Sequence, residues 1–111
     1  MNKQILNMGL VAGRHDIPAS QTKEGFIFDR KLTPAELTNP CWLEDIVSDN
    51  LKQIIDNDAD NVELRLTVTG LTVTLVAVIN MCIKLGIDLI LLHYDRDTNK
   101  YFTQEVITNL I

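Results

Sequence analysis

Residues 62–93, VELRLTVTGLTVTLVAVINMCIKLGIDLILLH, carry the pattern that decides the fold. Residues 62–68 alternate between apolar and polar side chains, which is typical of a strand with one buried face. Residues 73–85 are apolar nearly all round and stop at Gly86, which predicts a helix with a glycine C-cap that is buried on more than one side. Residues 87–93 are almost continuously apolar, which favours a strand at the centre of a sheet. This order of strand, helix and strand predicts parallel pairing through a right-handed crossover.

The N-terminal half adds a further strand, a long loop and a second helix. Residues 5–12 form the first predicted strand, in which Gly9 indicates close approach by a neighbouring segment. The loop of residues 13–25 is long for so small a domain, and such loops are usually functional or disordered. Residues 26–29 are either a short second strand or an apolar segment that closes this loop. The sequence Thr33-Pro34-Ala35-Glu36 has the form of a capping box that opens a short helix, and residues 41–56 are the first full helix.

The C-terminal residues predict a hairpin, and with it the fold class. Residues 95–100 form a polar turn and residues 101–107 a last, antiparallel strand. The expected fold is α/β, a small Rossmann-like three-layer sandwich over residues 1–111, with a mostly parallel sheet and a C-terminal antiparallel hairpin. Its parallel core has three strands. The polar side of residues 62–68 and the all-apolar helix 73–85 leave surfaces that one small domain does not cover, so we expect a homodimer.

Composition excludes several classes of protein. The 15 acidic and 10 basic residues give a net charge of -5, which argues against a protein that coats DNA or RNA and against docking on anionic lipid. Cys41 and Cys82 lie in apolar segments with no CxxC or Cys/His cluster, so we expect a reducing, cytoplasmic compartment, no metal and no cofactor. No secretory leader and no apolar run of membrane-spanning length is visible.

Three segments that follow predicted strands are expected to meet at one edge of the sheet. In parallel sheets ligands bind beyond the carboxyl ends of the strands. Those ends are followed by three groups of candidate ligand-binding residues: Gly13, Arg14 and His15; then Thr69, Gly70, Leu71 and Thr72; then His93 and Tyr94. Both histidines of the chain fall in these groups.

Each group has a chemical interpretation and a structural alternative. Residues 69–72 join a strand to a helix N-terminus, where free amides bind anions; the alternative is an ordinary turn with Thr72 as the helix cap. Arg14 offers a planar fork for phosphate and His15 can move a proton; the alternative is a solvated loop in which Arg14 pairs with Asp16. His93 and Tyr94 contact a ligand or else pack structurally, and residues 95–97 are interpreted as a charged hairpin tip.

Arg14-His15 after the first strand and Thr69-Gly70-Leu71-Thr72 before a helix resemble the CARF-like fold. The size and outline are similar to the small CRISPR-associated ring nucleases and related phage-borne proteins. The resemblance implies a Rossmann-like homodimer that binds a nucleotide second messenger of the cyclic oligonucleotide type, in phage defence or counter-defence. It further implies that the protein either sequesters this ligand or, as a ring nuclease, cleaves it without a metal.

In such an enzyme, Arg14 and the amides of residues 69–72 would hold the phosphate, and His15 or His93 would transfer the proton. Arg14 and His15 are therefore the candidate catalytic residues. Two alternatives stay open. One is a small acidic protein-interaction module, such as a phage-type inhibitor that covers a basic surface of a host defence protein, and the other is a dimeric structural domain without a small ligand.

Overall fold

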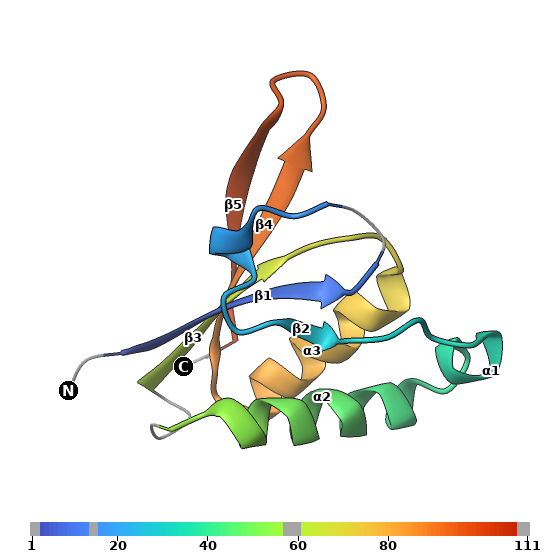
Figure 1. The fold of residues 1–111 in the computed structure, drawn as a ribbon. Coiled ribbons are helices and arrows are strands. Elements are labelled where there is room, and N and C mark those ends of the chain that lie inside the picture. Colours follow the sequence, from blue (N-terminus) through green and yellow to red (C-terminus); the bar gives the residue numbers. More distant parts are fainter. Residues whose placement is uncertain (1–2, 14–15, 57–60, 109–111) are drawn as a thin grey trace.

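A computed structural model describes residues 3–13, 16–56 and 61–108 of the chain, and its centre is a five-stranded sheet (Figure 1). The strand order is β2-β1-β3-β4-β5, and β5 is antiparallel to β4 while the other neighbours are parallel. This confirms the predicted Rossmann-like α/β class, with its mostly parallel sheet and C-terminal hairpin. The strands are β1 (Gln4–Val11), β2 (Phe26–Phe28), β3 (Val62–Thr67), β4 (Asp88–Asp95) and β5 (Lys100–Val106).

The two long helices lie on one face of the sheet. Helices α2 (Pro40–Ile54) and α3 (Thr72–Leu85) pack against each other there, and the short α1 (Pro34–Leu37) precedes them (Figure 1). The 3-10 turn η1 (Ala19–Gln21) contacts β1 and β3 on the opposite face. The layer opposite the helices is therefore thin, and it leaves much of that face of β4 and β5 uncovered.

Strand register explains why the helices pack on this face. Residues opposite one another in neighbouring parallel strands point to the same side, so leucine and methionine form rows across the sheet. The two rows are Leu6, Leu64 and Leu89, and Met8, Leu66 and Leu91. All six side chains are buried, and they face apolar residues of the helices, among them Leu43, Val47, Leu51, Val78 and Cys82.

Two details of the predicted sheet are wrong. The central strand is β3 and not β4, because β5 continues the sheet on the far side of β4. The parallel part has four strands and not three, because β2 pairs with β1. The alternation of β3 now has a physical reason. Its side chains opposite the helices, Glu63, Arg65 and Thr67, face the thin layer, and only Thr67 at the carboxyl end is buried.

The helix boundaries agree with their sequence features. Thr33 and Glu36 form the predicted capping box at α1, and Gly86, with a φ of 72°, ends α3. The guanidinium of Arg30 donates to Glu36, and together with the amide of Thr33 it lowers the pKa of that carboxyl from 4.5 to about 2. Helix α3 is buried by the sheet and by α2, but its remaining side is open.

Gly9 has the close neighbour that its sequence position predicts. A Cβ atom at Gly9 would lie 2.4 Å from the ring of Phe26 and 3.2 Å from Ile17. The missing side chain therefore lets β2 and the segment before it settle on β1. Among the described residues no helix has the length and apolarity needed to span a membrane.

Candidate functional site

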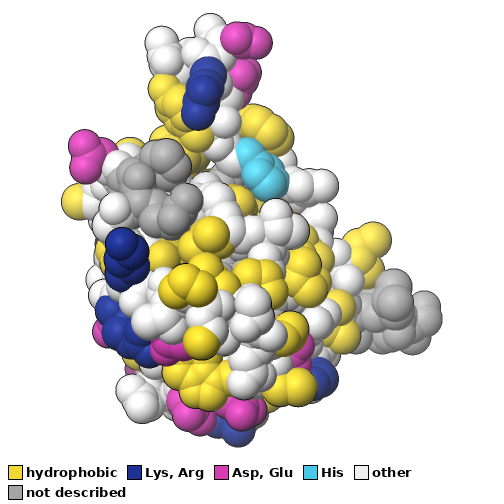
Figure 2. Space-filling view, turned by 90° about the vertical axis from the view of Figure 1, so that its right-hand side faces the viewer, with side chains coloured by type: hydrophobic (Ala, Val, Ile, Leu, Met, Phe, Trp, Pro, Cys, Tyr) yellow, Lys and Arg dark blue, Asp and Glu magenta, His cyan; other side chains and the backbone are white. Residues whose placement is uncertain are grey.

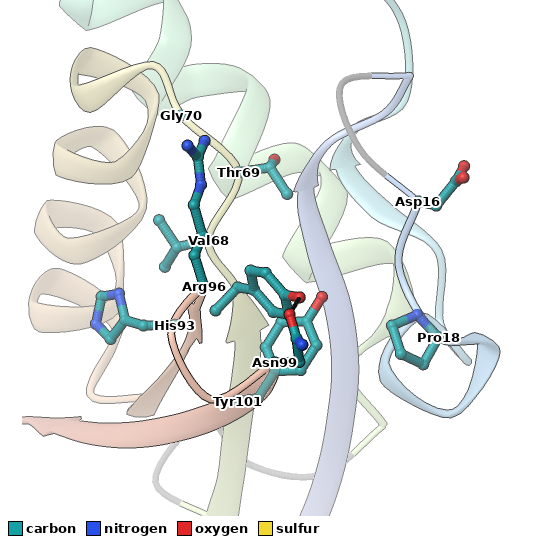
Figure 3. Close-up of a pocket in the computed structure, with 10 residues that line it drawn as sticks. Asp16, Pro18, Val68, Thr69, Gly70, His93, Arg96, Asn99 and Tyr101 are labelled. Carbon is teal, nitrogen blue, oxygen red and sulfur yellow. Dashed lines mark hydrogen bonds between the residues drawn. The ribbon is translucent and has the colours of Figure 1, made fainter.

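A cavity of about 670 Å³ opens at the carboxyl edge of the sheet, where β3 and β4 end (Figure 3). Three segments far apart in the chain enclose it: the start of the long loop, the turn after β3 and the β4–β5 hairpin. Its volume is that of an ordinary small-molecule site. The described residues that line it are Asp16, Pro18, Val68, Thr69, Gly70, His93, Tyr94, Arg96, Asn99 and Tyr101.

The turn after β3 is anchored by buried hydroxyl groups. The Thr69 Oγ1 atom lies 3.4 Å from both the amide nitrogen and the carbonyl oxygen of Val11, so it ties the turn to the end of β1. Two residues before Thr69, the Thr67 hydroxyl donates to Gln21 Oε1 at 2.9 Å and holds η1 on the sheet. Thr69 is therefore occupied in a structural role even though it borders the cavity.

The backbone of this turn is left-handed at two consecutive residues. Gly70 has a φ of 61° and Leu71 a φ of 53°. For a residue with a Cβ this conformation costs about 1–2 kcal/mol. Backbone strain of this kind is concentrated at binding sites and switches, where surrounding structure maintains it. The turn after β3 is therefore a conformation that the fold enforces.

The predicted cap of α3 is wrong. Leu71 and not Thr72 is the N-cap residue, and no described side chain caps its first-turn amides. Thr72 is the first helical residue, and the hydroxyl of Thr74 donates to the Leu71 carbonyl at 2.6 Å. The uncapped amides of the first turn remain a positive end of the helix beside the turn at Gly70.

The hairpin supplies an aromatic and cationic wall. The rings of Tyr94 and Tyr101 lie 5.3 Å apart at 59°, and the Tyr94 hydroxyl donates to Asn99 Oδ1 at 2.8 Å. The side chain of Arg96 extends along the cavity toward the turn at Gly70 (Figure 3). Within the described residues Arg96 has no ion-pair partner, so its charge is open to an anionic ligand.

His93 borders the cavity from the face of the sheet that carries the helices. Its Nε2 atom lies 2.8 Å from Gln104 Oε1, and its ring stacks on Phe102 with centroids 5.2 Å apart. When Nε2 donates this hydrogen bond, Nδ1 is the acceptor nitrogen of the neutral ring. The side chains of Gln104 and Phe102 thus hold the ring in one orientation.

The structure brings some of the predicted site residues together and leaves others apart. Thr69, Gly70, His93 and Tyr94 line the cavity as a group. Leu71 and Thr72 are not among the described residues that line it, and neither is Gly13, although it directly follows β1. Arg14 and His15 lie outside the described residues, so their roles stay predictions.

Sequence reasoning found only part of the contribution of the hairpin. It places Arg96 after the strand that ends at this edge, as a basic group available to an anion, but favours a charged tip for it and assigns no role to Asn99 and Tyr101. A usable indication was present, because antiparallel pairing sets Tyr94 opposite Tyr101 and so puts both rings on one face. Asp16 belongs to the segment predicted to follow the first strand to this edge, and it lines the cavity.

The donor set suits an organic anion better than a metal. No group of three or more histidine, cysteine or carboxylate side chains that could hold an ion occurs in the described ranges. Aromatic rings, an arginine and backbone amides are the groups that bind a base and a phosphate. Burial raises the pKa of the Cys82 thiol to about 12, so this cysteine is no nucleophile.

Comparison of the chain with protein-family models, with curated proteins and with solved structures found no match. The class of protein therefore rests on the fold and the cavity. It is a small α/β domain with a ligand-sized site at the carboxyl edge of a mostly parallel sheet.

Proposed function

We propose that the protein binds a nucleotide second messenger of the cyclic oligonucleotide type at this cavity. The observation that carries the proposal is the juxtaposition of the Tyr94–Tyr101 ring pair with Arg96 and the turn at Gly70. A base stacks on the tyrosines, and the adjacent phosphate binds the guanidinium and the backbone of the turn. A cyclic oligonucleotide has several base–phosphate units, so the proposal includes a homodimer in which two such sites act together.

The same arrangement supports sequestration, and it supports cleavage without a metal. In cleavage a ribose 2′-oxygen attacks the adjacent phosphorus in line, the bond from phosphorus to the 5′-oxygen breaks, and a 2′,3′-cyclic phosphate forms. A base takes the proton of the 2′-hydroxyl and an acid returns one to the 5′-oxygen. His93 is the described residue with the right chemistry for this proton transfer, and His15 is the further candidate from the sequence.

Calorimetric titration with AMP, a cyclic dinucleotide and cyclic oligoadenylate tests the proposal. We expect cyclic oligoadenylate to bind most tightly, and Arg96→Ala to weaken its binding by about 1–3 kcal/mol, the usual effect of losing a hydrogen bond to a charged group. Arg65→Ala is the matched control, because Arg65 is exposed and paired with Glu63 away from the cavity. Equal binding by wild type and Arg96→Ala, or no binding of any of these nucleotides, would contradict the proposal.

Three further variants separate binding from catalysis. Arg14→Ala is expected to weaken binding by a similar factor, and a role in binding predicts little change in melting temperature. His15→Ala and His93→Ala should slow cleavage if the protein is an enzyme and leave affinity nearly unchanged if it only sequesters the ligand. Strong destabilisation by Arg14→Ala with unchanged binding would assign that residue to structure.

A second candidate function is a protein-interaction module. The observation in its favour is the exposure of large apolar side chains on a protein with a net charge of -5, among them Val76, Ile83 and Phe102. This alternative predicts that no nucleotide binds at the cavity and that the Arg96→Ala variant behaves as wild type in every binding assay.

A further inference from the structure

Strand β5 is an edge strand that lacks the usual protection against pairing. It pairs with β4 over seven consecutive residues without a bulge, and in the described part of the chain it has no other partner strand. Five of its seven residues are exposed, and its sequence KYFTQEV contains no proline and no charge between Lys100 and Glu105. Such an edge presents a row of free amide and carbonyl groups to another strand.

The opposite edge of the sheet is protected. Strand β2 has only three residues, and the side-chain amide of Asn50 on α2 donates to the carbonyl of Ile27 there. The contrast between the two edges indicates that β5 is left open for a partner.

Exposed apolar side chains lie on the helix-bearing side of the molecule, on β5 and on the outer side of α3. Register places Phe102 of β5 opposite His93 on that face, and 54 % of the Phe102 side chain is exposed. On α3, Asn80 and Lys84 contact Glu44 of α2, whereas Val76 and Ile83, 45 % and 49 % exposed, have no such cover. Figure 2 shows hydrophobic side chains gathered in a band across this side of the molecule, below the histidine.

We infer that a second copy of this chain pairs with β5 in antiparallel orientation, so that one continuous sheet crosses the dimer and the two α3 helices meet beneath it. A two-fold axis perpendicular to the sheet sets each β5 against its copy and keeps the helices of both copies on the same face. The edge groups then satisfy one another, and Phe102, Val76 and Ile83 of each copy become buried together.

The size of the surface favours a second copy over a short peptide. The seven residues of β5 extend about 23 Å and the fourteen of α3 about 21 Å. Taken as strips about 10 Å wide, they project roughly 450 Å², which is more than half of the ~800 Å² of accessible surface per partner in stable dimers. A peptide added to the edge alone covers only half of this surface and leaves α3 open.

Charge also favours self-association at this place. The chain as a whole carries -5, so two copies repel each other over most of their surface. The charged residues of β5 and α3 are only Lys84, Lys100 and Glu105, which makes this surface slightly basic. Two acidic copies therefore approach each other here without like-charge acidic contacts.

Sedimentation velocity at micromolar concentration tests the interface. We expect wild type to sediment as a particle of twice the chain mass of 12.5 kDa. Phe102→Lys and Ile83→Lys should each raise the dissociation constant of the dimer about tenfold or more. The control Gln53→Lys adds the same charge at an exposed site of α2 and should remain dimeric. Circular dichroism checks that each variant is folded, and the Ile83 variant keeps the test independent of the hairpin.

Each outcome decides the proposal. A monomeric wild type overturns it, and so does a variant at either Phe102 or Ile83 that is folded and remains fully dimeric. The inference takes up the homodimer of the proposed function but does not depend on its ligand. A dimer that binds no nucleotide would contradict the proposed ligand and leave the β5 interface supported. A monomer that binds nucleotide would contradict the β5 interface and leave the proposed ligand supported.

Discussion

Substitution of Gly9 by alanine tests how the long loop is seated on the sheet. In an unobstructed strand, alanine in place of glycine stabilises by about 0.5–1 kcal/mol, because the unfolded chain has less conformational freedom to lose. At Gly9 the new Cβ would lie 2.4 and 2.5 Å from two atoms of the Phe26 ring, so the ring has to move by about 1 Å to restore an ordinary contact. Overpacking of this kind costs about 1–3 kcal/mol. We therefore expect Gly9→Ala to lower the free energy of unfolding by about 1–2 kcal/mol.

A double-mutant cycle isolates the steric cause. In the Phe26→Ala background the ring is gone, and Gly9→Ala should be neutral or stabilising by up to about 1 kcal/mol. The coupling energy is then about 2 kcal/mol, within the range found for residues in contact. Urea denaturation of the four proteins measures it, and the Gly9→Ala melting temperature should fall by roughly 4–8 °C per kcal/mol.

Gly13→Ala serves as the control for backbone strain. Gly13 has a φ of 78° and open space around a Cβ, so its substitution should cost the same with or without the Phe26 ring. A Gly9→Ala variant that is more stable than wild type, or a Gly9 effect of equal size in both backgrounds, would refute the close approach of Phe26.

The remaining predictions concern the turn, one ion pair and the cysteines. Gly70→Val should lower stability by about 1–2 kcal/mol or more and weaken nucleotide binding, since a β-branched residue at a φ of 61° is strained; unchanged urea midpoint and affinity would contradict this. The pKa of Glu36 is lowered from 4.5 to about 2 in the folded chain, chiefly by Arg30, so its stabilisation is complete above pH 4.5 and is lost as the pH falls toward 2. The free energies of unfolding of wild type and Glu36→Gln, measured against pH, should converge over that interval. A constant difference between the two proteins would argue against the Arg30–Glu36 ion pair. Cys41 is exposed, whereas burial raises the pKa of Cys82 to about 12, so a thiol reagent at pH 8 should label one cysteine per native chain and two after denaturation; two in the native state would contradict this assignment.

The secondary-structure elements could be predicted from the sequence because they depend on interactions between residues close together in the chain. A capping box at Thr33, a glycine cap at Gly86 and the alternation from Val62 onward each reflect hydrogen bonds or burial within a few residues of chain. Gly9 belongs to the same class, since a missing side chain in a strand indicates a close neighbour even when the neighbour is unknown. Fold class, hairpin and most element boundaries followed from such features.

The set of residues that line the cavity was only partly predictable from the sequence. The rule for parallel sheets located the turn at Gly70 and the end of β4, and so placed Thr69, His93 and Tyr94 correctly at its border. The contribution of Arg96 and Tyr101 depends on how the hairpin twists back over the sheet edge. Local sequence carries no measure of that twist, because it results from the packing of all five strands.

The sequence by itself thus determined the α/β class, the strand and helix segments and the edge of the sheet at which the cavity lies. Only the tertiary structure decided that β3 is central, that both long helices share one face, and that β5 and α3 leave an open surface beside the hairpin. The physical reason is the range of the interactions. Periodicity records whether a side chain is buried, but the segment that buries it is selected by contacts between residues distant in the chain, and those leave no mark on the local pattern.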